Sequence, residues 1–342
     1  MIEGRLFRRL ARVAIAAVGI ALLAPGAEAQ TTPQGPNEWL CDASYQDCRA
    51  PLIRLIQNEN VGIDVAFWFM QDARYKAEIV RRWQAGVPVR VLMDPAANPS
   101  YPGNDQILAD LAAAGIPMRM RKSTAPGILH WKMMLFVGQG QMEFSGANYS
   151  PTAFVPQTPY VDFEDETLYF TDDLSVVQSF MTEYDNHWIE TTYYQDYANI
   201  ASPPARRYPI YIKDSALNFP QAENYEDRLA KRYPKELERL DVIMYRITDE
   251  RETNLVISTL QRGIPVRVIS DDKEYRFPNR QWVSYNLDKL YAAGVPLRVR
   301  GHAGLNHQKL VLFYRNTPAV VALLVMSRWT SYECMTRFAS SR

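Results

Sequence analysis

Residues 85–94 read Ala-Gly-Val-Pro-Val-Arg-Val-Leu-Met-Asp, and residues 262–271 read Arg-Gly-Ile-Pro-Val-Arg-Val-Ile-Ser-Asp, 177 positions later. A match of this kind that returns over about 70 residues indicates an internal duplication, and the repeat decides the architecture. The supporting matches are 113–119 with 292–298, Asp64 with Asp241, and Asp72 with Asp249.

Each half has the same predicted order of elements. An apolar strand leads into a segment of helical period, a glycine ends that helix, and an alternating strand, a further helix and a further strand follow. Strands that alternate with helices predict α/β structure. We therefore expect two pseudo-symmetric lobes, each a mixed, mostly parallel sheet flanked by helices. The predicted helices are 74–84, 105–114, 173–191, 252–261 and 281–293.

The two halves are separated by a proline-rich stretch, Ser202-Pro203-Pro204, which we interpret as a linker. The expected lobes are therefore 30–200 and 201–342. Residues 1–29 belong to neither, because four arginines, a short apolar run and Ala27-Glu28-Ala29 form the layout of a secretory signal peptide. An apolar run of about 12 residues is too short to cross a bilayer. We expect a secreted or periplasmic protein.

The cysteines and the net charge fit an exported protein. Cys41 and Cys48 lie seven positions apart in a polar segment, which predicts a short disulfide in an oxidising compartment. Without residues 1–29 the chain carries 34 basic and 36 acidic side chains, a net charge of −2. Non-specific binding to nucleic acid usually needs a basic surface, so a nucleic-acid partner is less expected.

The chain has four histidines, and two of them fall at the repeat offset. The motifs are His130-Trp131-Lys132 and His307-Gln308-Lys309, and each leads into an apolar strand. Residues i and i+2 of a strand share a face, so each His and its Lys point to the same side. We predict that the two pairs form one catalytic site. His187 and His302 have no matched partner and are expected to be structural.

This residue set suits phosphodiester chemistry. A neutral imidazole can attack phosphorus to form a phosphohistidine, and a second, protonated imidazole can donate to the leaving oxygen and later activate water. Two ammonium groups stabilise the charge of the transition state. The arrangement requires no metal, and we predict no cofactor.

The doubled HxK motif, followed by Ser145-Gly146-Ala147-Asn148, resembles the phospholipase D superfamily, whose pattern is HxK, four residues, Asp, and then G-S-x-N. The resemblance covers roughly residues 40–313. It implies that Asn148 helps to hold the phosphate and that Glu166, or next Glu164, supports the site. By analogy with the family, we assign His130 as nucleophile and His307 as general acid.

The sequence departs from the family pattern in two places. Val137 and Tyr314 occupy the positions of the usual Asp. In the second half, residues 326–330 read Met-Ser-Arg-Trp-Thr, with Arg where the family has Asn. The last strand and helix of this half are expected to be short or missing. We hypothesise that the chain after about residue 314 is altered or truncated, for example by a reading-frame change, which would also account for the leftover Cys334.

The sequence therefore predicts an exported phospholipase D that acts on phospholipid head groups through a phosphohistidine. Two alternatives stay open: an exported nuclease or other phosphodiesterase with the same chemistry, and a catalytically impaired binding protein. The expected partner is a phospholipid or another phosphodiester, with peripheral contact to a membrane. The sequence makes no prediction of the oligomeric state, the head group, or the balance of hydrolysis and transphosphatidylation.

Overall fold

The structure, a computed structural model, describes residues 38–219, 224–314, 321–325 and 336–340. The expected signal peptide (1–29), the string 326–330 and Cys334 lie outside these residues. In the part of the chain that is described, no helix combines the length and the apolar character needed to cross a membrane.

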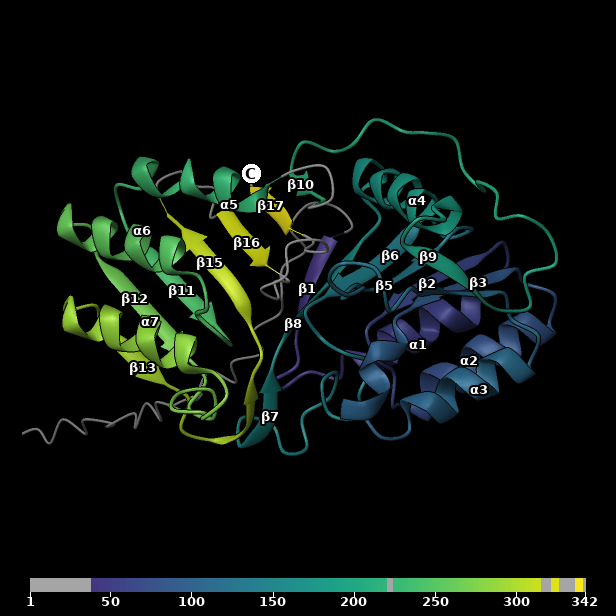
Figure 1. Ribbon diagram of the computed structural model, residues 1–342, viewed down its shortest axis with the longest axis horizontal. Helices are drawn as coiled ribbons and strands as arrows, with labels where there is room; N and C mark the ends of the chain where they lie inside the picture. Colours follow the sequence, from purple (N-terminus) through teal and green to yellow (C-terminus); the bar gives the residue numbers. More distant parts are fainter. Residues whose placement is uncertain (1–37, 220–223, 315–320, 326–335, 341–342) are drawn as a thin grey trace, which may run out of the picture. The chain divides into compact units, whose positions relative to one another are not determined.

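The first lobe contains an eight-stranded sheet (Figure 1). Its elements are β1 (Glu38–Asp42), α1 (Arg49–Asn58), β2 (Ile63–Phe67), α2 (Ala73–Gln84), β3 (Val89–Met93), a 3-10 helix (Pro95–Ser100), α3 (Asn104–Ala113), β4 (Met118–Arg121), β5 (Lys132–Phe136), β6 (Gln141–Ser145), β8 (Thr167–Thr171), α4 (Leu174–Ile189) and β9 (Tyr194–Ala198). The strand order is β1-β8-β6-β5-β2-β3-β4-β9. Every residue of β2, β3 and β5 is buried, as expected for central strands covered on both faces.

The second lobe repeats this order in a seven-stranded sheet, β10-β17-β16-β15-β11-β12-β13. Its elements are β10 (Leu217–Asn218), α5 (Tyr225–Ala230), a 3-10 helix (Tyr233–Lys235), β11 (Leu240–Met244), α6 (Glu250–Gln261), β12 (Val266–Ser270), α7 (Gln281–Ala292), β13 (Leu297–Val299), β15 (Lys309–Phe313), β16 (Val321–Val325) and β17 (Thr336–Ser340). The duplication read from the sequence is therefore confirmed at the level of sheet topology.

The expectation of mostly parallel sheets is wrong. In the first lobe β2, β3 and β4 are parallel neighbours, whereas the other pairs of that sheet are antiparallel. The second lobe has the same pattern. Strand–helix–strand crossovers produce the parallel part, but short turns such as the one between β5 and β6 reverse the chain and give antiparallel pairs.

Helices cover both faces of the first sheet. Helices α1, α2 and α3 lie on one side and α4 lies on the other (Figure 1). Tyr75 and Ile79 of α2 pack with Val65 and Phe67 of β2, whereas Phe180 of α4 packs with the opposite face. In the second lobe α6 and α7 cover one face, and among the described residues α4 and β9 have no counterpart there. The mixed α/β, two-lobe fold is confirmed.

The matched aspartates and glycines of the repeat have local structural roles. Asp72 caps α2 by accepting from the backbone N–H of Arg74, and Asp249 caps α6 in the same way. Gly86 and Gly263 follow these helices with φ of +87° and +82°. A residue with a side chain is strained in that conformation, so glycine ends both helices.

An ion pair inside the repeated strands also recurs. Arg90 Nη2 lies 2.7 Å from Asp64 Oδ2, and at the equivalent positions Arg267 Nη2 lies 2.6 Å from Asp241 Oδ2. In the first lobe Asp185 of α4 adds a second carboxylate, 2.8 Å from Arg90 Nη1. Because α4 covers this face, Arg90 is buried there, whereas Arg267 is exposed.

A small parallel sheet joins the two lobes. Strand β7 (Asp162–Asp165) of the first lobe pairs with β14 (Ala303–Asn306) of the second, in the register Gly304↔Phe163 and Asn306↔Asp165. Gly304 has φ of +95°, and a Cβ there would lie 1.8 Å from the carbonyl oxygen of Phe163. Only glycine permits this close approach. We call the β7–β14 pairing the interlobe clamp.

The end of the second lobe differs in part from expectation. Its last strand is not missing, because β17 spans five residues, like β8, and pairs with both β16 and β10. Among the described residues, helix α4 has no counterpart in the second lobe. The predicted disulfide is present between Cys41 and Cys48 and connects β1 to the start of α1.

Candidate active site

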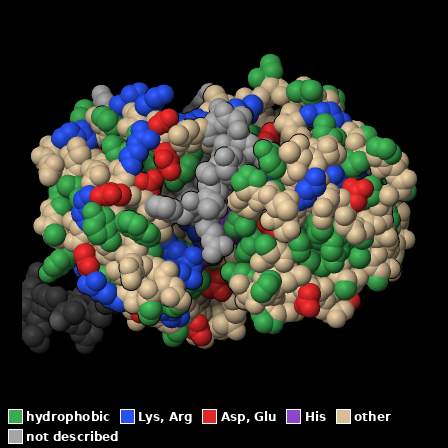
Figure 2. All heavy atoms as spheres, viewed as in Figure 1, with side chains coloured by type: hydrophobic (Ala, Val, Ile, Leu, Met, Phe, Trp, Pro, Cys, Tyr) green, Lys and Arg blue, Asp and Glu red, His purple; other side chains and the backbone are tan. Residues whose placement is uncertain are grey.

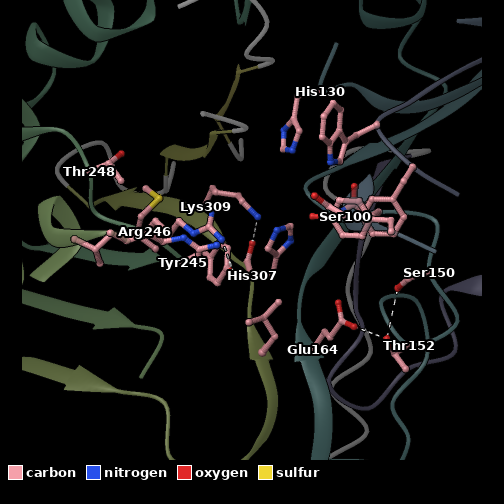
Figure 3. Close-up of a pocket in the computed structure, with 18 of the residues that line it drawn as sticks. Ser100, His130, Ser150, Thr152, Glu164, Tyr245, Arg246, Thr248, His307 and Lys309 are labelled. Carbon is pink, nitrogen blue, oxygen red and sulfur yellow. Dashed lines mark hydrogen bonds between the residues drawn. The ribbon is translucent and has the colours of Figure 1, made fainter. Parts of the chain in front are cut away.

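Predicted site residues from both lobes line one cavity of about 730 Å³, although Lys132 and Glu166 are not part of its lining. His130 and Asn148 line it from the first lobe, and His307 and Lys309 line it from the second. Figure 3 shows both imidazoles turned toward this common space. The histidines of the two motifs thus belong to a single site. Its further lining includes Glu164, Thr152, Tyr245 and Arg246.

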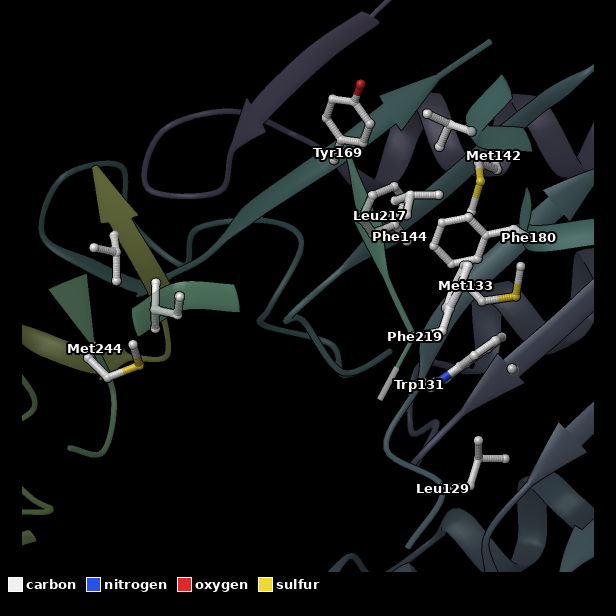
Figure 4. Packing of buried hydrophobic residues seen from close by; sticks show 14 of the residues in the cluster. Leu129, Trp131, Met133, Met142, Phe144, Tyr169, Phe180, Leu217, Phe219 and Met244 are labelled. Carbon is white, nitrogen blue, oxygen red and sulfur yellow. The ribbon is translucent and has the colours of Figure 1, made fainter. Parts of the chain in front are cut away.

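Each HxK motif has the strand geometry that the sequence predicts. Lys132 Nζ donates to the carbonyl oxygen of His130 at 2.8 Å, and Lys309 Nζ makes the same bond to His307. The intervening Trp131 points to the opposite face, where it packs on Phe180 and Phe219 with ring-centroid distances of 6.0 and 6.1 Å (Figure 4). This buried ring anchors the start of β5 and therefore the backbone of His130.

The aspartates that end the repeated strands fix the residue before the histidine of each HxK motif. Asp94 Oδ2 accepts from the N–H of Leu129, and Asp271 Oδ2 accepts from the N–H of Asn306, at 2.9 and 2.8 Å. Both carboxylates also accept a bond from their own turn, at Ala96 and Lys273. Both aspartates therefore have a structural role, because they hold the backbone next to each histidine.

Glu166 supports the histidine of the opposite lobe. It lies directly after β7, and His307 lies directly after β14, so the clamp places the two residues on adjacent chains. The backbone N–H of His307 donates to the Asp165 carbonyl at 3.1 Å, and Nδ1 of His307 is hydrogen-bonded to Glu166 Oε1. With Nδ1 occupied, Nε2 of His307 is the ring nitrogen available for chemistry.

The charged groups around Glu166 have strongly shifted pKa values. Burial raises the pKa of Glu166 to about 7, although Lys309 and Lys132 oppose the shift. Burial lowers the pKa of Lys309 to about 7, and burial together with Lys309 holds the pKa of Lys132 well below its usual value. Burial and both lysines lower the pKa of His307 as well. Shifts of this kind are typical of functional sites.

The glycine and asparagine of the Ser-Gly-Ala-Asn segment lie at the same place. A Cβ on Gly146 would lie 3.1 Å from Glu166 Oε2 and 3.6 Å from Lys309 Nζ. Asn148 lines the cavity, and its buried Oδ1 has no hydrogen-bond partner among the described residues. A buried polar atom left in this state is suited to contact a bound molecule.

The missing family aspartates leave the cavity intact. Val137 and Tyr314 follow the ends of β5 and β15 that lie away from the HxK motifs, and neither lines the cavity. The Tyr314 hydroxyl donates to Asp241 Oδ2 at 2.8 Å. His187 and His302 also lie outside the lining: His187 packs on Trp131 in the core, and His302 stacks on Phe163 beside the clamp.

The sequence did not predict the aromatic wall of the cavity. Trp68 and Phe69 follow the apolar strand β2 and are only 5% exposed, yet they line the cavity together with Tyr101. The ring of Phe69 stacks on Tyr101 at a centroid distance of 3.7 Å. Comparison across the repeat could have identified this position. Trp68 and Phe69 correspond to Tyr245 and Arg246 in the second half, and an arginine is not expected at a position that faces a hydrophobic core.

Comparison with known proteins agrees with the fold. A family model described as the cardiolipin synthase, phospholipase D-like domain matches residues 52–188 and 234–324. The crystal structure of phosphatidylserine synthase from Haemophilus influenzae Rd KW20 is similar, with a TM-score of 0.65 and 14% identity, over 90% of this chain and 83% of that one. Polyphosphate kinase from Porphyromonas gingivalis matches with a TM-score of 0.56 and 13% identity, over 88% of this chain and 47% of that one. No curated protein sequence matches.

Proposed function

Because the chain belongs to the phospholipase D superfamily, we propose that it is an exported phosphodiesterase that cleaves the head group from phospholipids. One observation carries the proposal: His130 and His307 from the two lobes line one cavity. Glu166 binds Nδ1 of His307, which leaves Nε2 of this histidine available for reaction. Two imidazoles around one anion-binding space are the minimum set for a double displacement at phosphorus.

In the first step Nε2 of His307 attacks phosphorus, and the bond from phosphorus to the head-group oxygen breaks. His130 donates a proton to that oxygen, so the head group leaves as a neutral alcohol. Lys309 and the amide nitrogen of Asn148 line the cavity and donate to the phosphoryl oxygens, and the bound anion favours the ammonium form of Lys309. The product of this step is a phosphohistidine that carries the phosphatidyl group.

In the second step water attacks the same phosphorus. His130, now neutral, accepts the proton of the water, and the nitrogen–phosphorus bond breaks to release a phosphomonoester and regenerate His307. This assignment reverses the one made by family analogy. The reason is the hydrogen bond of His307 Nδ1 to Glu166, which directs the lone pair of a neutral imidazole into the cavity.

A phospholipid fits the cavity better than nucleic acid does. The wall formed by Trp68, Phe69 and Tyr101 is apolar, and acylglycerol is the apolar side of a phospholipid. Basic and acidic side chains are interspersed on the face seen in Figure 2, and the chain without residues 1–29 has a net charge of −2. The presence of both HxK histidines at one cavity supports an enzyme over an impaired binding protein. The Cys41–Cys48 disulfide supports export.

Trapping of the covalent intermediate tests the proposal. An alkyl p-nitrophenyl phosphate labelled at phosphorus needs little acid assistance, because p-nitrophenolate is a good leaving group. We expect the label to accumulate on His130→Asn, which lacks the base for the second step, and not on His307→Asn. The opposite pattern would reverse the two roles. Absence of turnover and of label in the wild-type protein would refute the hydrolase, and faster cleavage of single-stranded DNA than of phospholipid would refute the lipid substrate.

A further inference from the structure

The two walls of the cavity come from equivalent positions of the duplication but have opposite character. After β2 the first lobe places Trp68 and Phe69 at the cavity, and after β11 the second lobe places Tyr245 and Arg246 there. The first wall is aromatic and uncharged. The second carries a guanidinium at the position of Phe69. A substrate that fills this space therefore meets different chemistry on its two sides.

A second arginine extends the charged wall. Arg246 Nε lies 2.7 Å from Glu274 Oε2, and Arg280 Nη1 contacts both oxygens of the same carboxylate. The Tyr245 hydroxyl donates to Glu274 Oε1 at 2.6 Å. Glu274 is 3% exposed, and these bonds hold its pKa below the usual value, so the carboxylate is ionised. Two guanidinium groups share one carboxylate, which leaves one positive charge in excess.

The arginines keep donors for a ligand. Within the described chain, no hydrogen bond uses Nη1 of Arg246 or Nε and Nη2 of Arg280. Both side chains line the cavity, with exposed fractions of 26% and 33%. Guanidinium groups with a fixed orientation and unused donors are suited to bind carboxylate or phosphate.

The charged wall is adjacent to the reacting groups. The ring of Tyr245 lies 4.9 Å from the ring of His307, and the Arg246 guanidinium lies 4.4 Å from the same tyrosine ring. Figure 3 shows Arg246 and Tyr245 on the same side of the cavity as Lys309. The ring of Tyr245 therefore separates an anion bound by Arg246 from the phosphorus that His307 attacks.

We propose that Arg246 and Arg280, held by Glu274, form a subsite for a second anionic group of the substrate, separate from the scissile phosphate. The preferred substrate is then a phospholipid whose head group carries a carboxylate or a second phosphate. Its acylglycerol side lies along Trp68, Phe69 and Tyr101. This inference rests on the proposed function, because it defines which phosphodiester the same cavity selects.

Two pairs of soluble dihexanoyl lipids test the subsite. Phosphatidylserine and phosphatidylethanolamine differ by one carboxylate, and phosphatidylglycerol phosphate and phosphatidylglycerol differ by one phosphate. We expect the wild-type protein to favour the anionic member of at least one pair by about 10- to 100-fold in kcat/KM, as typical for a charge-assisted hydrogen bond. The pair that shows the preference identifies the source of the anion.

The variant Arg280→Gln removes the excess charge and leaves Glu274 paired with Arg246, so the buried carboxylate keeps a partner. We expect the kcat/KM ratio within the pair to fall by about tenfold. Arg280→Glu should abolish or invert the preference. The matched control is Arg276→Gln, which removes an arginine of the same lobe that pairs with Asp288 outside the cavity. This control should retain the wild-type ratio.

A binding measurement separates this inference from the proposed function. Trp68 and Trp282 line the cavity, so tryptophan fluorescence can report binding of the same lipids to His307→Asn, which does not turn them over. Turnover without preference in either pair, or a preference that Arg280→Gln leaves unchanged, overturns the subsite but not the hydrolase. If the lipids are not turned over, but the protein binds the anionic member more tightly and Arg280→Gln removes this preference, the hydrolase is refuted and the subsite is supported. If neither turnover nor selective binding occurs, both fail.

Discussion

Glu166 and His307 belong to different halves of a duplicated chain, yet a hydrogen bond joins the carboxylate of one to Nδ1 of the other. The interlobe clamp brings them together, because it pairs Asp165 with Asn306, the residues that directly precede Glu166 and His307. The imidazole of His307 in the second lobe is therefore oriented by a carboxylate of the first.

The substitution Glu166→Gln should slow hydrolysis by about 10²- to 10⁴-fold, because an amide cannot stabilise the charge that develops on His307. Steady-state rates on a soluble phospholipid measure the effect. The matched control is Glu143→Gln on the neighbouring strand. Glu143 accepts a hydrogen bond from the Tyr149 hydroxyl at 2.9 Å and does not line the cavity, so its amide variant should retain the wild-type rate. Equal effects of both substitutions would contradict the role of Glu166.

The substitution Gly304→Ala should destabilise the protein by about 2–4 kcal/mol, because its Cβ collides with the Phe163 carbonyl and its φ is left-handed. Activity should fall as well, since the clamp sets the position of His307. Denaturant unfolding and the hydrolysis rate measure the two effects. Gly301→Ala is the control, because a Cβ there would meet nothing within 4 Å. Wild-type stability of Gly304→Ala would show that the lobes do not meet in this register.

Anion binding should take up protons from solution. In the free protein burial lowers the pKa of Lys309 to about 7, so the amine is mostly neutral at pH 8. A nearby anion favours the ammonium form and raises this pKa. Binding at pH 8 should therefore take up as much as about one proton, and affinity should weaken as pH rises above 7.

Calorimetric titration with sulfate, repeated in buffers of different ionisation enthalpy, measures this uptake. Sulfate itself does not titrate near pH 8, so the protons must go to the protein. Lys309→Met should take up fewer protons than the wild type. Uptake that is zero in the wild type would mean that the lysines are already charged in the empty cavity.

Reduction of the Cys41–Cys48 disulfide should lower the free energy of unfolding by about 2 kcal/mol, the value expected for a short closed loop. Neither cysteine lines the cavity, so the rate of hydrolysis at low temperature should stay near that of the oxidised protein. Unfolding with and without reductant, compared with the double variant Cys41→Ser/Cys48→Ser, measures the change. If reductant also lowers the free energy of unfolding of the double variant, the effect does not come from this disulfide.

The repeat made much of the structure predictable. Duplicated motifs identify equivalent positions, so the lobes, and the shared face of each His and Lys, follow from counting along the chain. Glu166 was also identified, but by family resemblance. Its contact with His307 is a fact of three-dimensional pairing, which a one-dimensional repeat does not contain.

The remaining features have no strong local pattern. Strands β7 and β14 are four residues each, Asp-Phe-Glu-Asp and Ala-Gly-Leu-Asn, and neither sequence has the alternation typical of a strand. Trp68 and Phe69 continue an apolar run that begins in β2, so burial in the core and burial against a cavity look alike in sequence. The antiparallel strands were missed because the turn after β5 was not recognised as a hairpin.

The clamp also limits how the two halves of the coding sequence can change. A mutation at position 166 disables a histidine encoded 141 codons downstream, and a side chain at position 304 disturbs both lobes at once. Neither copy of the ancestral unit is therefore free to diverge on its own, and a gene fragment that encodes one half would specify only one wall of the cavity.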